Sequence, residues 1–433
     1  MKKVLLFTFF SFVMIVANSQ VVTPDFGIKF SGFVKYDAFY DTRQTVNIRE
    51  GHFVLYPDNI LLDALGNDIN ASPSINMLSI QTRLKGAITG PDAFGAKTSG
   101  IIEADFFGNE NANFSDVNGF RLRHAIIKLS WDKTEIIAGQ YWNPFFVTDV
   151  FPGVITFNTG APFNPFSRNP QFRLTQKLGA LSIILAAYTQ RDFSSTGPGG
   201  SSSIYLRNSG IPTGHIQFQL KPGVGDHIFG IGADYKILKP RLYNEITYTD
   251  TMVINGATYL PGVKVKYQVN ETVSAFSAFG YAKLKFEPVT IKLYGIYAQN
   301  ATDLTMIGGY AVKEITNTQT GECDYLPLTT ASAWTEIISN GKKVQVGVFA
   351  GYTKNMGATD SIAGKFYARG SNIDYVYRIS PRIVFINEKL SIALEPEYTS
   401  ALYGKENGNG KGLPTDAKAV NNLRMLFSMT YNF

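Results

Sequence analysis

Residues Leu423–Phe433 read LRMLFSMTYNF, and their side chains alternate in character along the segment. The odd-numbered positions carry leucine, methionine, phenylalanine or tyrosine, while four of the five even-numbered positions carry arginine, serine, threonine or asparagine. Successive side chains of a β-strand point to opposite faces of its sheet, whereas a helix would spread both kinds around its axis. The segment is therefore predicted to be a strand with one apolar face and one polar face.

The same alternation recurs along the chain, beginning with residues 28–41. Fourteen more segments show it, which brings the number of predicted strands to sixteen. About nine residues suffice for a tilted strand to cross the hydrocarbon layer of a membrane. The fourteen segments are residues 76–89, 97–107, 119–131, 134–142, 171–177, 180–190, 211–221, 227–236, 272–286, 289–299, 328–338, 343–354, 372–385 and 390–403.

The links between these segments alternate between short and long. Seven are short, such as residues 132–133, 178–179 and 287–288, and the others are longer, such as 42–75 and 143–170. Short turns at one end and long loops at the other are typical of closed barrels in bacterial outer membranes, where closure leaves no unpaired edge in lipid. The sequence predicts an all-β fold, a transmembrane antiparallel β-barrel of sixteen strands with eight extracellular loops and both chain ends on the periplasmic side.

The composition agrees with a barrel. Aromatic residues make up 13% of the chain and charged residues only 17%, below the roughly 25% of soluble domains. No run of eighteen apolar residues is present, which excludes helical membrane spans. The formal charge of +6 is too small to indicate nucleic-acid binding, and the single cysteine, Cys323, excludes an intrachain disulfide. No cofactor motif is found, so we expect no cofactor.

The N-terminal residues have the character of an export signal. Lys2 and Lys3 precede the apolar run Val4–Ala17, and small residues occupy positions 17 and 19. This is the pattern of a secretory signal peptide, and the apolar run is shorter than the roughly 20 residues of a membrane-spanning helix. Residues 1–19 are therefore predicted to be a cleaved signal peptide, and residues 20–433 a single barrel domain in the bacterial outer membrane.

The long link after the fifth predicted strand, residues 143–170, differs from the other loops. It contains five prolines together with several phenylalanines. Proline cannot continue a central strand, and the segment is too apolar to extend into water. We therefore expect this loop to fold into the barrel.

Two segments fit the barrel pattern less well. Strict alternation in residues 119–131 would turn Arg121 and Arg123 toward lipid. A β-bulge, a subunit contact or a strand end beyond the bilayer would each resolve the conflict. The link 237–271 is rich in β-forming residues and is predicted to hold an extra hairpin above the membrane.

Three stretches carry a resemblance to a known family. They are GFVKYDAFYDTRQ at Gly32–Gln44, FRLRHAIIKLSW at Phe120–Trp131 and IIAGQYWNPFF at Ile136–Phe146. With these stretches the chain resembles the outer-membrane porins of Bacteroides-type bacteria and, more distantly, the DcaP-like trimeric porins. The resemblance implies a homotrimer in outer-membrane lipid with the loop after the fifth strand inside the lumen. The final Phe433 is similar to the signal that the barrel-assembly machinery reads in most such barrels.

The polar faces of the predicted strands carry more basic than acidic residues. Charged rings in a narrow lumen bias which ions enter, so we expect a passive diffusion channel for small polar solutes with a mild anion preference. The alternative is that these charges only hydrate the wall or pair with one another, as Arg83 and Glu103 on neighbouring strands would. The candidate pore-lining and constriction residues are Arg83, Lys85, Lys97, Glu103, Asp105, Lys128, Gln140, Asp149, Arg168 and Arg173.

Other functions remain open at this point. The channel could be specific for sugars or small carboxylates, and outer-membrane barrels also include enzymes and purely structural proteins. The four histidines do not belong to a recognisable catalytic motif such as GxSxG or HExxH. The first long loop contains Asp58, Asp63 and Asp68, but without the spacing of a calcium loop. We therefore expect neither catalytic activity nor a metal site.

Overall fold

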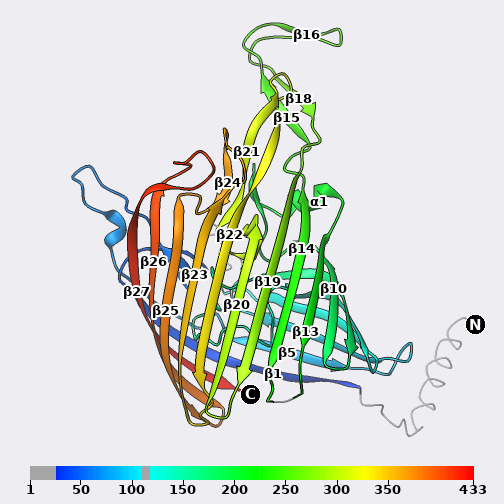
Figure 1. Ribbon diagram of the computed structural model, residues 1–433, viewed down its shortest axis with the longest axis vertical. Helices are drawn as coiled ribbons and strands as arrows, with labels where there is room; N and C mark the ends of the chain where they lie inside the picture. The colour runs from blue at the N-terminus through cyan, green and yellow to red at the C-terminus, as the bar shows by residue number, and fades with distance from the viewer. Residues whose placement is uncertain (1–25, 109–117, 224) are drawn as a thin grey trace, which may run out of the picture.

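The computed structural model describes residues 26–108, 118–223 and 225–433; the predicted signal peptide, residues 1–19, lies outside these ranges. Within them, sixteen antiparallel strands close into a barrel, as predicted (Figure 1). Strand β27 pairs with β1, so that Tyr36 lies opposite Met429. In order around the barrel the strands are β1 (Gly27–Asp41), β5 (Arg83–Thr89), β6 (Lys97–Asp105), β7 (Arg121–Ser130), β8 (Thr134–Trp142), β9 (Arg168–Leu178), β10 (Leu181–Tyr188), β13 (Thr213–Leu220), β14 (Ile228–Leu238), β19 (Val273–Lys285), β20 (Val289–Gln299), β22 (Glu322–Ser339), β23 (Val344–Gly357), β25 (Ile373–Asn387), β26 (Leu390–Lys405) and β27 (Thr415–Asn432).

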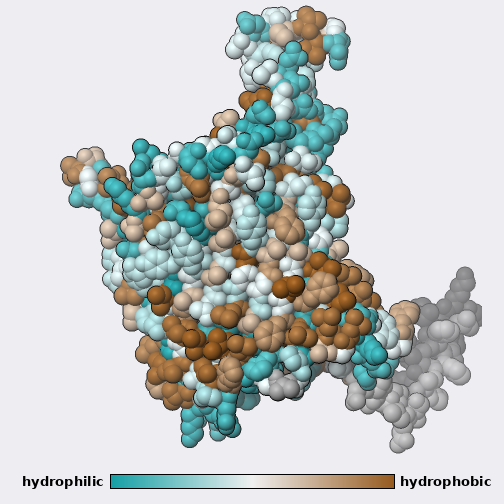
Figure 2. Space-filling view, in the orientation of Figure 1, coloured by the Kyte–Doolittle hydropathy of each residue, from teal (hydrophilic) through white to brown (hydrophobic). Residues whose placement is uncertain are grey.

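The two faces of the barrel wall reverse the usual arrangement of a soluble protein. In β13, His215, Gln217 and Gln219 are buried, while Phe218 and Leu220 between and beside them are exposed. Apolar residues gather in a band over the lower part of the strands, and polar residues cover the loops above and the turns below (Figure 2). A closed barrel with an apolar outer belt and a polar inner face is the form in which a sheet spans a bilayer. The chain is thus a β-barrel of the bacterial outer membrane.

The connections have the predicted asymmetry. Short turns join the strands at the end of the barrel that carries the C-terminus, which identifies this end as periplasmic. Long loops lie at the other end, and the extra hairpin expected in residues 237–271 is present there. It consists of β15 (Tyr243–Thr247) paired with β18 (Lys264–Gln268), and β16 (Met252–Ile254) paired with β17 (Ala257–Tyr259) beyond them.

The remaining elements are not among the sixteen barrel strands. None of the helices in the described residues is long and apolar enough to cross a membrane. These elements are β2 (Thr45–Ile48), β3 (Phe53–Pro57), η1 (Ile69–Ala71), β4 (Ser74–Leu78), β11 (Thr196–Gly197), β12 (Gly200–Ser201), α1 (Ile204–Ser209), η2 (Ala301–Leu304), β21 (Gly308–Asn317) and β24 (Phe366–Arg369). Of these, β4 pairs with β1 and β21 pairs with β22.

Strand boundaries differ most from the predicted ones in two places, and smaller shifts occur elsewhere, such as the start of β22 at Glu322. The predicted strand 76–89 is interrupted, because the backbone turns between β4 and β5, where Thr82 N–H donates to the Ser79 carbonyl. Strand β27 begins at Thr415, well before the alternating segment at its end. Above the membrane both faces of a strand meet polar surroundings, so the alternation that marks a strand in lipid is lost there.

A β-bulge resolves the conflict at Arg121 and Arg123. Opposite β6, His124 pairs with Glu103 and Leu122 pairs with Ala104, so that Arg123 is an extra residue without a partner of its own. The extra residue restores the alternation and turns both arginines into the lumen. Gly139, across from the bulge on β8, has a φ of +129°, and a Cβ there would lie 2.1 Å from the Ala125 carbonyl oxygen. Only glycine fits this position without displacing the backbone.

Candidate functional site in the barrel lumen

The loop between β8 and β9, residues 143–167, crosses the lumen as expected. Its tip reaches the opposite side of the barrel, where Gly153 N–H donates to Glu336 Oε1 over 2.7 Å. Two further amides of the tip donate to one carboxylate, Ile155 N to Glu395 Oε2 at 2.8 Å and Thr156 N to Glu395 Oε1 at 3.2 Å. The two glutamates, on β22 and β26, therefore hold the loop tip by its backbone.

These glutamates belong to a group of charges that we call the docking wall. Its ion pairs include Lys292 with Glu336 at 2.7 Å and Arg424 with Asp41 at 2.6 Å, and Arg382 also contacts Glu336. Five basic and five acidic groups balance each other. The docking wall consists of Lys35, Asp37, Asp41, Lys292, Glu336, Arg378, Arg382, Glu395, Glu397 and Arg424.

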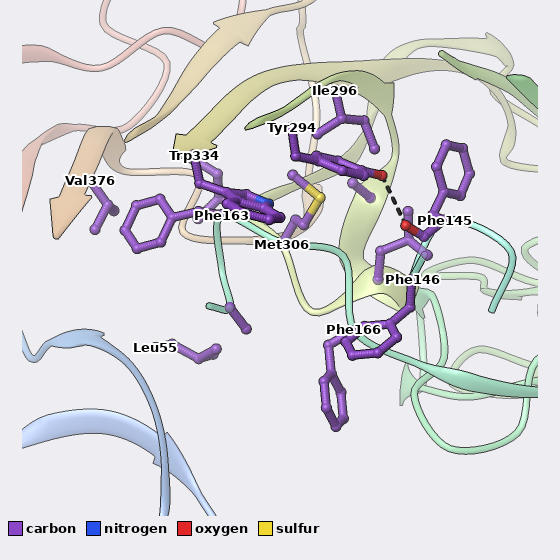
Figure 3. Packing of buried hydrophobic residues seen from close by; sticks show 14 of the residues in the cluster. Leu55, Phe145, Phe146, Phe163, Phe166, Tyr294, Ile296, Met306, Trp334 and Val376 are labelled. Carbon is purple, nitrogen blue, oxygen red and sulfur yellow. Dashed lines mark hydrogen bonds between the residues drawn. The ribbon is translucent and has the colours of Figure 1, made fainter. Parts of the chain in front are cut away.

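Apolar packing holds the body of the loop against the wall. The Tyr294 hydroxyl donates to the Phe145 carbonyl over 3.0 Å, and Phe163 lies beside Trp334 (Figure 3). Phe145, Phe163 and Phe166 are each at most 1% exposed. Burying a phenylalanine side chain contributes roughly 1.5–3 kcal/mol, so this packing is a large part of what keeps the loop inside.

The hairpin β2–β3 adds a second layer to this core. Phe53 is fully buried, and its ring lies 5.0 Å from that of Phe166 in the loop. Arg378 of the docking wall joins the two segments, since its guanidinium donates to the Leu55 carbonyl in the hairpin and to the Ala161 carbonyl in the loop. The lumen therefore contains an apolar core built from two extracellular segments.

Near the base of the loop, arginines collect on β5, β7 and β9. Arg123 is central: its Nε lies 2.8 Å from Glu103 and its Nη1 lies 2.8 Å from Asp105. Among the described residues, four guanidinium groups of these strands face three carboxylates, which leaves an excess of one positive charge. We call this group the basic wall; it consists of Arg83, Arg121, Arg123, Arg168, Glu103, Asp105 and Asp192.

Aromatic rings and one loop carboxylate keep the basic wall together. Arg123 and Arg168 lie over the Trp142 ring, 5.6 and 5.4 Å from its centroid. Burial raises the pKa of Asp192, but the guanidinium groups of Arg168 and Arg121 outweigh it, so this pKa stays below its usual range. Asp192 is therefore a permanent negative charge near neutral pH.

Several of the predicted site residues meet in the basic wall. Arg83, Glu103, Asp105 and Arg168 belong to it, and the weighed pairing of Arg83 with Glu103 is present at 3.6 Å. Lys85 lies directly across from Glu103 in the sheet. Charge pairing and a role in permeation are compatible here, because the arginines outnumber their partners.

The remaining predicted site residues lie elsewhere. Lys128 pairs with Glu135, and Asp149 pairs with Lys221 at 2.8 Å. Gln140 donates to the Arg123 carbonyl at the bulge. Two more complete the set: Lys97 is exposed at the periplasmic end of β6, and Arg173 lies on β9 inside the barrel.

Sequence reasoning missed several charged residues that the structure brings together. Arg121 and Arg123 lie in the segment that contains the bulge, and alternation misplaces residues there. Asp192 lies in a loop, where no periodic signal exists. Glu336 and Arg382 were also missed, although the alternation of β22 and β25 places both inside the barrel and would have been sufficient to find them.

The histidines in the lumen face carboxylates. His52 lies 2.8 Å from Asp37, His124 lies 3.7 Å from Glu103, and His215 contacts Asp234. Among the described residues, no histidine is hydrogen-bonded to a serine, threonine or cysteine. These contacts pair a histidine with an acid but supply no nucleophile.

Comparison with known proteins gives structural matches only. No family model and no curated protein sequence matches the chain. In-vitro folded OmpT, an outer membrane protein of Vibrio cholerae, is 9% identical with a TM-score of 0.53, and the match covers 96% of this chain and 100% of OmpT. The trimer form of OmpT is 10% identical with a TM-score of 0.51, covering 94% and 99%.

The name of one further matching structure includes an ion selectivity. The anion-selective porin from Comamonas acidovorans is 10% identical with a TM-score of 0.52, and the match covers 94% of this chain and 100% of the porin. At such identities the likeness shows the fold alone. A porin-like barrel is thereby supported, while the narrower resemblance to Bacteroides-type and DcaP-like porins stays a prediction.

Proposed function

We propose that the protein is a porin, a passive diffusion channel for small polar solutes with a mild preference for anions. The observation that carries the proposal is the placement of the basic wall, with its excess of one guanidinium group among the described residues, where the inward loop leaves β8 and returns to β9. A solute that passes the loop exchanges part of its hydration for contact with these groups. Charge counts for more there than in bulk water, because the local dielectric constant is lower.

The preference is expected to be modest. Glu103, Asp105 and Asp192 neutralise three of the four arginines, and salt screens exposed charges within roughly 8 Å at physiological ionic strength. The docking wall adds no net charge. Chloride and small carboxylates should therefore pass more readily than potassium, but not exclusively.

Reversal potentials in a potassium chloride gradient test this proposal. The purified protein, reconstituted in a planar bilayer, is expected to conduct and to give a potential of the sign for anion selectivity. Replacing Arg83 and Lys85 together with glutamate should shift this potential toward cation selectivity. A wild-type channel that prefers cations would refute the assignment of charges but not the channel. A barrel that carries no current would overturn the proposed function.

Further parts of the proposal concern activity, assembly and targeting. We propose that the protein acts without catalysis, since no serine, threonine or cysteine is hydrogen-bonded to a lumen histidine in the described part of the chain; hydrolase activity lost on replacing one histidine would argue for an enzyme. We also propose a cleaved signal peptide over residues 1–19 and a homotrimer, which cross-linking in membranes tests. Phe433 exchanges backbone hydrogen bonds with Gly32 as the barrel closes, and it is the residue that we expect the barrel-assembly machinery to read.

A further inference from the structure

The lumen contains a cavity of about 240 Å³ between the first part of the inward loop and the wall formed by β6 to β13. It lies in the periplasmic half of the barrel. Part of its lining is aliphatic or aromatic, although water-filled barrel interiors are polar. This apolar part consists of Ile101, Ile126, Ile137, Ile184, Phe146 and Val147. The volume is below the roughly 300–1,000 Å³ of pockets for drug-sized ligands, so only a small solute fits.

One cation in this cavity has neutral partners. Arg173 Nε donates to Gln171 Oε1 over 2.9 Å, and its Nη2 donates to the Trp142 carbonyl over 2.8 Å. Its guanidinium carbon lies 5.6 Å from the centroid of the Tyr141 ring. In the described ranges of the chain, no carboxylate lies within the 4.0 Å of an ion pair with Arg173. The guanidinium is thus held in place by neutral groups, and its positive charge is not compensated locally.

The other charges that line the cavity are compensated. Lys128 pairs with Glu135 across neighbouring strands, and Asp149 of the loop pairs with Lys221. The four charged residues of the described lining sum to zero, but Asp149 is paired with a lysine outside the lining, so Arg173 is the lining charge that has no partner of opposite sign. A planar guanidinium with fixed geometry is well suited to bind a carboxylate.

We propose that this cavity is a subsite for a small monocarboxylate with an apolar body. The carboxylate pairs with Arg173, and the body lies against the isoleucines. The proposal rests on the proposed function, since the solute reaches the subsite through the lumen. A dicarboxylate would lack a second unpaired cation, and a neutral apolar molecule would leave Arg173 without a counter-charge.

Titration calorimetry on the full-length protein in detergent tests the subsite, with benzoate as the probe. Benzoate should bind more tightly than acetate, which lacks the apolar body, and than benzyl alcohol, which lacks the charge. Arg173→Gln should weaken benzoate binding by about tenfold or more, as expected for the loss of a hydrogen-bonded charge pair. Arg173→Lys keeps the charge but loses the two-pronged geometry, so its affinity should be intermediate.

Two further variants separate the charge from the apolar contact. Lys177→Gln is the control for Arg173→Gln, because it also removes one positive charge from the inward side of β9. Lys177 lies outside the cavity lining, so this variant should leave benzoate binding unchanged. Ile184→Thr keeps the branch at Cβ but shortens the side chain and adds a hydroxyl group, so it should weaken benzoate binding while leaving acetate binding as it is. The lysine and threonine variants test the subsite even if the glutamine variant does not fold.

The outcomes distinguish the subsite from the channel. Equal binding of benzoate and acetate, or benzoate binding that is unaffected in both Arg173 variants, would overturn the subsite even if the protein conducts chloride. Benzoate binding that depends on Arg173 in a protein that carries no current would support the subsite and overturn the channel. Calorimetry does not require conduction, so the two failures are separable.

Discussion

The basic wall and the docking wall lie in the same lumen and are both built from buried arginines and carboxylates, yet they differ in charge balance. In the described part of the chain, the basic wall has four arginines and three acids, whereas the docking wall has five cations and five anions. The balanced wall receives backbone amides of the loop tip, and the unbalanced wall lies at the base of the loop. The docking wall, which fixes the loop tip, is therefore neutral. The basic wall, which carries the excess charge, lies where ions are expected to pass.

Removing the loop tip should have the largest effect, and this effect is on single-channel conductance. Replacing residues 152–164 with a short glycine-serine linker removes the backbone contacts to Glu336 and Glu395 and the packing of Phe163. We expect single-channel conductance to rise severalfold, because the barrier across the lumen is gone. Deleting residues 249–262, in the hairpin above the membrane, removes a similar length of chain and should leave conductance unchanged. Equal conductance in both deletions would show that the loop does not narrow the path.

Replacing one glutamate of the docking wall with an uncharged residue should lower the stability of the folded barrel. Glu336→Gln leaves the buried Arg382 and the partly buried Lys292 without their counter-charge, and breaking a buried ion pair typically costs about 3–5 kcal/mol. The temperature at which the folded barrel unfolds on a gel should fall. Glu245→Gln breaks exposed pairs with Lys264 and Lys266, which contribute about 0–1 kcal/mol, and serves as the control. An equal fall in both variants would contradict the structural role of the docking wall.

Removing one arginine from each wall should separate selectivity from stability. Arg121→Gln takes a positive charge from the basic wall and should shift the reversal potential toward cations, with the smaller loss of stability of the two variants, because Asp105 keeps Arg123 as a partner. Arg378→Gln removes a positive charge that is enclosed by loop and hairpin carbonyls, and it should lower stability with little change in selectivity. Reversal potentials and unfolding temperatures of both variants check this. Identical selectivity shifts would mean that both walls face the ion path.

The smallest expected effect is that of salt concentration on the anion preference. The Debye length falls to roughly 3 Å at 1 M ionic strength, so the field of the basic wall should be screened and anion preference should decline. Buried ion pairs are screened much less, so the unfolding temperature should change little. Selectivity measured at rising salt concentration tests the difference, and a preference that persists at high salt would point to direct binding rather than to the field.

The barrel itself could be predicted from the sequence, because lipid on one side and polar surroundings on the other impose a strict alternation. The inward loop could also be predicted, since prolines and phenylalanines together exclude both a strand and a solvated loop. The alternation ends where the strands leave the membrane, and this is why the start of β27 at Thr415 was not found. The interruption between β4 and β5 depends on tertiary pairing with β1 and has no local signal.

The site could be predicted only in part. Alternation finds inward residues, and it found Arg83, Glu103, Asp105 and Arg173. It does not reveal which inward charges meet, because the packing of the loop decides this. A single bulge reverses the assignment of Arg121 and Arg123, and a bulge cannot be located by counting alone.

The docking of the loop tip has a consequence for how the protein forms. Gly153 contacts a residue 183 positions later, and Ile155 contacts one 240 positions later. Contacts between such distant positions must overcome the entropy of closing long loops, and they form late in folding. The loop therefore cannot settle until β22 and β26 have joined the sheet. During assembly the lumen is therefore not yet filled by the loop tip, and its filling is a late step of folding.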